Sequence, residues 1–294
     1  MITVMKHSET EKQNKFYEQI SKDSKESLIQ LLSKAGHGKT SSLRTIIHYI
    51  KQNNENMQFI IFDVSQAWFH CAPVQHRQLV TRERLNAGQV AYLTDCVYEM
   101  GKLTQDERRA FVGQIVSKHY QERYQAKLDG ALKEMSFLVF IFEEANTYFG
   151  SRTMTKNDAF TPIFVDFVSV GRNYKMRGFL VATAEEGEIH PLLRRRSSRI
   201  YGRLESDGDI SRIRRKDKEL ASYLKEIPKY NFVYYNGNQF GPVKIPDVVT
   251  NEPVDYEVSV PIVTQPKSDG SGWWIKFQGT IAIFLLFWSW LMGI

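Results

Sequence analysis

Short runs of apolar residues alternate along the chain with longer segments in which apolar residues recur every three to four positions. Continuous runs are typical of strands buried in a parallel sheet, and the periodic segments are typical of amphipathic helices. The runs predict strands at 28–32, 58–64, 89–93, 137–142, 179–183 and 199–204. The periodic segments predict helices at 40–51, 105–128, 160–170 and 207–226. This alternation predicts an α/β domain with a mainly parallel sheet.

The two ends of the chain differ in composition from this core. Residues 1–26 are polar and charged, and we interpret them as an N-terminal extension that is partly helical around 11–21. The segments 231–235 and 239–245 flank Asn-Gly-Asn and predict a C-terminal hairpin. Prolines and a Ser-Asp-Gly-Ser-Gly stretch are typical of a linker. The predicted division is an extension, a core domain, a linker and a C-terminal segment at 1–26, 27–245, 246–272 and 273–294.

The C-terminal segment contains 18 consecutive residues, 277–294, without a charged side chain. As a helix it would be about 27 Å long, close to the thickness of a bilayer core. Trp273, Trp274 and Lys276 precede it, where interfacial side chains flank membrane spans. A buried core helix or an oligomer contact is the alternative, although the segment is apolar on every face. We expect a transmembrane tail anchor at 273–294, with the body of the protein in the cytoplasm.

The stretch Ser-Lys-Ala-Gly-His-Gly-Lys-Thr lies between the first predicted strand and helix. Its two glycines allow backbone N–H groups to turn toward a phosphate, and the helix N-terminus faces the same anion. Lys39 would reach the β- and γ-phosphates of ATP, and Thr40 would ligate Mg²⁺. Ser33 replaces the usual first glycine, so an ordinary strand-to-helix turn is the alternative. The candidate nucleotide-binding residues are Ser33, Lys34, Ala35, Gly36, His37, Gly38, Lys39, Thr40 and Ser41.

Two carboxylates follow directly after the most apolar predicted strand, at 137–142. The C-terminal edge of a buried parallel strand is where a phosphate-binding loop finds its acidic partners. We expect Glu143 to hold Mg²⁺ and Glu144 to activate the attacking water. A solvated strand end or a helix N-terminal pair is the alternative. With Lys39, Glu144 is the predicted catalytic group.

Three further stretches come next: Gly171-Arg-Asn-Tyr-Lys, the strand ending in Ala182-Thr183, and Ser198-Arg-Ile-Tyr-Gly-Arg-Leu. Together with the loop and the acidic pair, their order and spacing resemble the HerA/FtsK superfamily of DNA-pumping ATPases. The resemblance covers about 28–245. It implies a RecA-like P-loop core that hydrolyses ATP with Mg²⁺ and forms a homo-oligomeric ring, usually a hexamer, on double-stranded DNA.

The resemblance places Arg172 as an arginine finger that acts on the nucleotide of the neighbouring subunit. A cation at a helix C-terminus is the alternative. Arg199 and Arg203 match a later strand of the family and are secondary candidates. Ala184 departs from the family, which commonly has a Gln sensor there, and Asn146 replaces a more common His.

The net charge bears on the kind of partner the protein binds, and the cysteine spacing argues against a zinc or redox site. The net charge of +6 permits a nucleic acid or an anionic membrane as partner. Arg194, Arg195 and Arg196 form a basic run that is a weak candidate for DNA binding, with a solvated surface as the alternative. Cys71 and Cys96 lack metal or redox spacing, and we expect free thiols in a reducing compartment and no zinc site.

The expected function is a membrane-anchored, ATP-driven motor that packages a viral genome into a preformed particle. A small DNA-pumping ATPase with a membrane tail resembles the viral genome-packaging branch, whose partners would be a capsid vertex or portal-type proteins. The virion internal membrane is then a second possible location. Filamentous-phage assembly ATPases are the alternative, but they carry a domain after their membrane helix. A non-catalytic membrane adaptor is the third hypothesis, because of Ser33 and Ala184.

Overall fold

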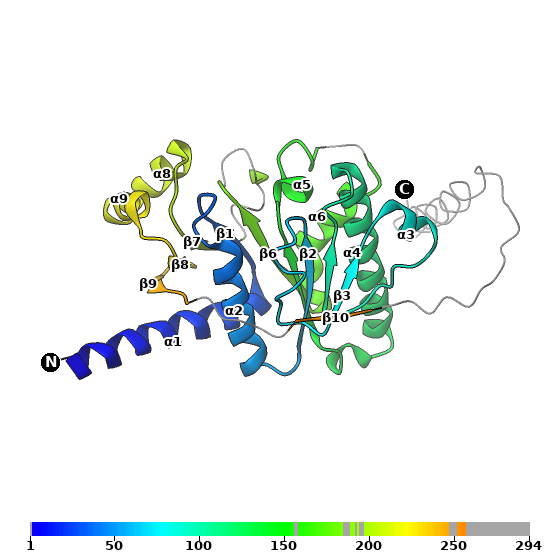
Figure 1. Cartoon of the computed structure of the whole chain (residues 1–294), viewed down its shortest axis with the longest axis horizontal. Helices are drawn as coiled ribbons and strands as arrows, with labels where there is room; N and C mark the ends of the chain where they lie inside the picture. The colour runs from blue at the N-terminus through cyan, green and yellow to red at the C-terminus, as the bar shows by residue number, and fades with distance from the viewer. Residues whose placement is uncertain are drawn as a thin grey trace, which may run out of the picture. The chain divides into compact units, whose positions relative to one another are not determined.

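The computed structural model describes residues 2–155, 158–184, 189–191, 193, 197–246 and 252–256, with the backbone alone for 2–9 (Figure 1). The chain divides into two compact units, 1–258 and 259–294. Within the described ranges, no helix is long and apolar enough to cross a membrane. The predicted tail anchor at 273–294 lies outside the described residues, and so does most of the predicted linker.

A single sheet organises the described part of the chain, with strands in the order β10-β3-β4-β2-β5-β6-β1-β7-β8-β9. Neighbouring strands from β10 to β7 pair in parallel, and β7, β8 and β9 pair antiparallel. The predicted α/β class, parallel sheet and C-terminal hairpin are therefore confirmed. The strands are β1 Leu28–Leu32, β2 Met57–Asp63, β3 His76–Leu79, β4 Cys96–Glu99, β5 Phe137–Phe142, β6 Met176–Ala182, β7 Ser197–Tyr201, β8 Asn231–Tyr235, β9 Gln239–Lys244 and β10 Val254–Asp255.

Helices cover both faces of this sheet. Alternate residues of β5 point to opposite faces, so that Phe140 and Phe142 pack against α4 and α6 while Val139 and Ile141 lie on the side of α1 and α2 (Figure 1). The continuous apolar run predicted a strand buried on both faces, and this packing confirms it. The helices are α1 Ile2–Glu26, α2 Lys39–Asn53, α3 Arg82–Asn86, α4 Gln105–Leu128, α5 Asn146–Phe149, α6 Thr161–Val170, α8 Asp207–Arg214 and α9 Lys218–Glu226, with 3₁₀ turns at Ala131–Lys133 and Gly171–Tyr174.

The predicted strand at 89–93 is wrong. That segment is a loop, in which the N–H groups of Ala91 and Leu93 donate to side chains, Gln78 Oε1 at 2.9 Å and Tyr98 Oη at 2.6 Å. The strands in this region are β3 and β4. The sequence His-Arg-Gln-Leu of β3 contains no apolar run, so the pattern gave no sign of it.

Two helical predictions change in extent. The N-terminal segment is helical throughout α1, and Phe16 and Ile20 are fully buried against the sheet. The single helix predicted at 207–226 is two helices, because the chain turns after α8 and Asp217 caps α9 by accepting the Leu220 N–H at 2.8 Å. The rest of the helical pattern agrees with the structure within a few residues.

Candidate functional site

The phosphate-loop residues connect the C-terminal end of β1 to the first turn of α2. Gly36 and Gly38 adopt left-handed conformations, with φ of 74° and 84°, which glycine reaches without steric cost. Lys39 begins α2, and its ammonium donates back to the carbonyl oxygens of Ser33 at 2.7 Å and Lys34 at 3.2 Å. The helix N-terminus and this lysine therefore face the same concave side of the loop, as an anion site requires.

Ser33 fits the position that usually holds a glycine because its neighbour Gly202, directly after β7, lacks a side chain. Ser33 is fully buried at the end of β1, and a β-carbon on Gly202 would overlap its Oγ. The Ser33 hydroxyl has no hydrogen-bond partner among the described residues. Neither Ser33 nor Gly202 has a positive φ, so glycine at 202 is needed for space and not for its backbone conformation.

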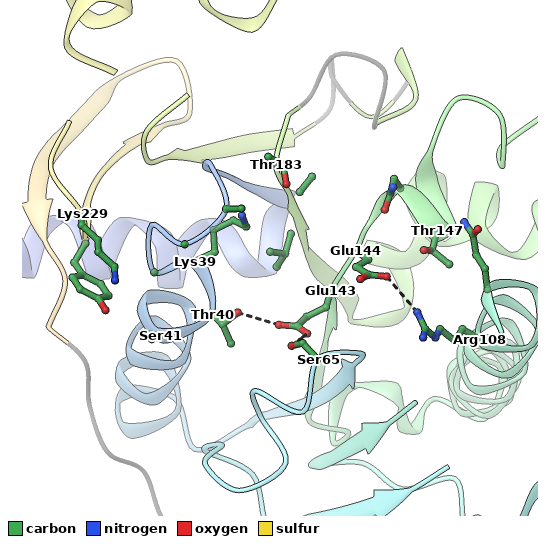
Figure 2. Close-up of a pocket in the computed structure, with 18 residues that line it drawn as sticks. Lys39, Thr40, Ser41, Ser65, Arg108, Glu143, Glu144, Thr147, Thr183 and Lys229 are labelled. Atoms are coloured by element: carbon green, nitrogen blue, oxygen red, sulfur yellow. Dashed lines mark hydrogen bonds and ion pairs between the residues drawn. The ribbon is translucent and has the colours of Figure 1, made fainter. Parts of the chain in front are cut away.

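Glu143 lies at the centre of a buried polar cluster at the end of β5. Its carboxylate accepts hydrogen bonds from Thr40 Oγ1 at 3.1 Å, Trp68 Nε1 at 2.7 Å and Ser65 Oγ at 3.0 Å (Figure 2). Asp63, at the end of the adjacent β2, is also fully buried and accepts the N–H groups of Trp68 at 2.9 Å and of two neighbouring residues. The loop after β2 is thereby held against Glu143.

The electrostatics of this cluster favour a bound cation. Burial raises the pKa of the Glu143 carboxyl to about 7, and the nearby Asp63 carboxylate acts in the same direction. None of the ion pairs between described residues involves Glu143, so its charge is without a protein countercharge. The described residues hold no group of three or more His, Cys, Asp or Glu side chains that could bind a metal ion. Mg²⁺ suits a site of this kind, because it uses few protein ligands and completes its shell with water and phosphate.

Glu144 turns away from this cluster toward α4. Its φ of 49° is left-handed, an uncommon conformation for a residue with a side chain. Its side chain is 55% exposed, and one oxygen lies 3.4 Å from Nη1 of Arg108 (Figure 2). Arg108 is itself fixed by donating to the carbonyl oxygens of Met100 at 3.1 Å and Gly101 at 3.2 Å. The acidic pair is thus divided into a buried carboxylate and one open to the pocket.

A cavity of about 870 Å³ joins these groups at the carboxyl edge of the sheet. Burial lowers the pKa of His37, and the positive charges of Arg203 and Lys34 lower it further. The loop therefore lies in a positive field that suits an anionic ligand. The cavity is lined by Ala35, Gly36, Gly38, Lys39, Thr40, Ser41, Ser65, Gln105, Arg108, Glu143, Glu144, Asn146, Thr147, Val181, Ala182, Thr183, Lys229 and Tyr230.

The structure brings most of the predicted site residues together; of the candidate arginines, Arg203 lies beside the phosphate loop and Arg172 lies away from the cavity. Arg172 precedes β6, at the sheet edge opposite the cavity, and forms an ion pair with Glu26. Arg199, on β7, donates to the carbonyl oxygen of Ser197 at 3.0 Å. The carbonyl oxygen of Arg203 accepts the Lys34 N–H at 2.7 Å. The basic run 194–196 lies outside the described residues.

Several residues of the cavity and its support were not predicted from the sequence. Asp63 is the last residue of an apolar strand, much as Glu143 directly follows one, and that pattern could have indicated Asp63. The others come from loops or helices that only the strand order places beside the phosphate loop. They are Ser65, Trp68, Arg108, Lys229 and Tyr230.

Comparison with known proteins identifies the fold. No protein-family model and no curated protein sequence matches the chain. The genome packaging NTPase B204 from Sulfolobus turreted icosahedral virus 2, in complex with sulfate, superposes with a TM-score of 0.50 at 14% sequence identity, over 74% of this chain and 97% of that chain. Its complex with AMPPCP gives a TM-score of 0.49 at 15% identity, over 74% and 98%.

A second neighbour is EssC (ATPases 2 and 3) from Geobacillus thermodenitrificans, with a TM-score of 0.49 at 12% identity, over 76% of this chain and 40% of that chain. The predicted P-loop NTPase core is present in the structure, with the phosphate loop and the acidic pair at one sheet edge. The chain therefore has the P-loop NTPase fold that the genome packaging NTPase B204 also has.

Proposed function

We propose that this protein is an ATP-driven motor that moves double-stranded DNA, and that it packages a viral genome into a preformed particle. One observation carries the proposal. A single cavity combines Lys39 and the start of α2 with a buried carboxylate, Glu143, and an open one, Glu144. Phosphate binding, cation binding and water activation need these three kinds of group in one place. The shared fold with a genome packaging NTPase supports the choice of DNA as cargo.

The proposed reaction divides the work among the residues of the cavity. The backbone N–H groups of the loop and the Lys39 ammonium bind the β- and γ-phosphates of ATP. Glu144 takes a proton from a water molecule as its oxygen attacks the γ-phosphorus, and the bond to the β–γ bridging oxygen breaks. ADP and inorganic phosphate leave, and Glu144 returns the proton to solvent. Arg108 positions Glu144 through their ion pair.

Thr40 and Glu143 would hold Mg²⁺, since their oxygens lie 3.1 Å apart and Glu143 lacks a countercharge. When bound, Mg²⁺ neutralises charge that develops on the phosphate oxygens. Trp68 and Ser65 keep the Glu143 carboxylate oriented toward Thr40.

The motor would act as a ring, expected to be a hexamer, in which Arg172 of one subunit reaches the nucleotide of the next. Support for this comes from the exposure of the Arg172 side chain, 56%, at the edge of the sheet away from its own cavity. The basic run 194–196 would contact DNA phosphates without reading sequence. A capsid vertex or portal-type protein would be the partner at the particle.

The tail 273–294 would anchor the ring in a membrane, with the ATPase body on the cytoplasmic side or at an internal virion membrane. Its 18 uncharged residues support this placement. Flotation with liposomes tests it: the full chain should float with the lipid, and a chain ending at 272 should stay at the bottom. Flotation of the shortened chain would contradict the anchor.

ATP turnover with and without double-stranded DNA tests the catalytic part of the proposal. Lys39→Ala should lose ATP binding, whereas Glu144→Gln should still bind ATP and turn it over about 10² to 10³ times more slowly. The unmodified protein should be stimulated by DNA, and the stimulation should weaken as salt is raised. Turnover equal in all three proteins would exclude a motor and leave the non-catalytic adaptor.

A further inference from the structure

The loop between α9 and β8 reaches the phosphate loop from a distant part of the sequence. Strand β8 runs antiparallel to β7, so its first residue lies at the same sheet edge as the end of β1. Tyr230, directly before β8, packs its ring on Gly38: a β-carbon on Gly38 would overlap the ring atoms Cδ1 and Cε1. Two features therefore favour glycine at position 38: its left-handed φ and the Tyr230 ring in the space a side chain would fill.

Tyr230 is held in an unusual backbone conformation. Its φ is 64°, and the Asn231 N–H donates to the carbonyl oxygen of Pro228 at 3.1 Å, which makes Tyr230 the third residue of a four-residue turn. Glycine or asparagine is favoured at such a position. The carbonyl oxygen of Tyr230 is fixed by the Ile245 N–H at 2.8 Å. A strained tyrosine that lines a cavity suggests a role for its ring.

The ring is available to a ligand. Tyr230 is only half-buried and lines the cavity. The ammonium of Lys229 lies over the ring, 4.8 Å from its centroid, so a base that stacks on that face would take the place of the ammonium. In Figure 2, Lys229 lies at the end of the cavity opposite Arg108, with Lys39 and Thr40 between them. The γ-phosphate and the base are at opposite ends of a nucleoside triphosphate, so an extended nucleotide with its γ-phosphate at Glu144 would have its base toward the end at Lys229.

We propose that Tyr230 and Lys229 form the base-binding end of the cavity, and that the purine ring of the nucleotide stacks on Tyr230. This rests on the proposed function, in which the cavity binds ATP. An aromatic ring stacks on any base, and a purine gives it more area than a pyrimidine. Lys229, whose ammonium lies over the Tyr230 ring, adds positive charge to the subsite. The subsite makes the protein selective for purine triphosphates over pyrimidine triphosphates.

Binding of ATP and of inorganic tripolyphosphate, measured by calorimetry on the full chain, separates base recognition from support of the loop. Tyr230→Ala should weaken ATP binding about tenfold and leave tripolyphosphate binding within about twofold, because only ATP carries a base. Tyr230→Phe, the matched control, keeps the ring and should bind both ligands as the unmodified protein does. Equal loss of both ligands would show that Tyr230 only supports Gly38, and would overturn the proposal.

A second measurement needs no variant and so does not depend on folding of the alanine protein. The unmodified protein should bind ATP and GTP about tenfold more tightly than UTP and CTP. Equal affinity for all four would overturn the stacking role while leaving ATP hydrolysis intact. Failure to bind any triphosphate or tripolyphosphate would overturn the proposed function, and the base subsite with it.

Discussion

Ser33 replaces a glycine of the usual phosphate-loop pattern, and the residue that allows the replacement is 169 positions away at Gly202. The loop itself does not need a glycine there, since Ser33 has no positive φ. What it needs is room for one small side chain beside β7. The substitution therefore carries no sign of a degenerate site, which was one motive for the adaptor hypothesis.

The contact between Ser33 and Gly202 predicts that mutations at these two positions have non-additive effects on stability. Gly202→Ala should lower the free energy of unfolding by about 2–3 kcal/mol, because the new methyl group would overlap Ser33 Oγ and lie 2.8 Å from Phe232 Cε1. Adding Ser33→Gly should recover about half of that loss, since the contact with Phe232 remains. Urea unfolding of both single mutants and the double mutant measures the coupling. Strictly additive effects would contradict the packing account.

The residues at 33–41 and 143–144 could be predicted from local sequence, because each group is contiguous and directly follows an apolar run that predicts a strand. Tyr230 could not be predicted in this way. Its role depends on a contact with Gly38 across the strand order β1-β7-β8 and on a strained turn that a Lys-Tyr pair does not suggest. Arg108 likewise lies mid-chain in a helix, and only the fold places it beside Glu144.

At the scale of elements, the site depends on two adjacent parallel strands, β2 and β5, whose ends carry Asp63 and Glu143. Asp63 binds three N–H groups of the loop that follows it, and this loop carries Trp68 and Ser65 to Glu143. The phosphate loop follows β1, whereas Asp63 and Glu143 lie at the ends of β2 and β5, so different strands position the loop and the two carboxylates. Sequence patterns predicted these strands well, because each is a continuous apolar run.

The loop after β2 gives a prediction at this scale. Asp63→Ala should lower the free energy of unfolding by about 3 kcal/mol, because the buried N–H of Trp68 and the partly buried N–H groups of Ser65 and Phe69 lose their acceptor. It should also raise the Mg²⁺ concentration needed for half-maximal turnover, since Trp68 would no longer be held on Glu143. Asp63→Asn keeps one acceptor oxygen. It should therefore lose less unfolding free energy and raise the Mg²⁺ requirement less than Asp63→Ala does. Unfolding and Mg²⁺ dependence like those of the unmodified protein would contradict this role.

At the scale of the whole molecule, the sheet separates the cavity from Arg172, which lies at the opposite edge. In the proposed motor, Arg172 would act on the nucleotide of a neighbouring subunit, and such head-to-tail contacts form a ring when the rotation between subunits closes. The alternation of apolar runs with helical segments predicted the parallel sheet. It could not predict β3, β4 or β10, because strands of two to four residues are too short to show a clear apolar run.

The ring hypothesis predicts complementation between inactive subunits. Lys39→Ala and Arg172→Ala should each abolish most turnover. Mixed in equal amounts, they should recover roughly a quarter of the normal rate, because some sites combine an intact Lys39 with an intact Arg172 from the neighbour. A mixture of Lys39→Ala and Glu144→Gln is the control. Lys39 and Glu144 line the same cavity of one subunit, so no site in this mixture holds both groups and turnover should not recover. No recovery in the first mixture would contradict a shared site.

The central claim is that ATP hydrolysis in this cavity moves the protein along double-stranded DNA. Displacement of a third strand from a DNA triplex measures such movement directly, because only a protein that travels along the duplex removes it. The unmodified full chain should displace the strand when ATP and Mg²⁺ are added, and Glu144→Gln should bind the duplex without displacing it. Rapid ATP turnover by the unmodified protein with no displacement would contradict a motor.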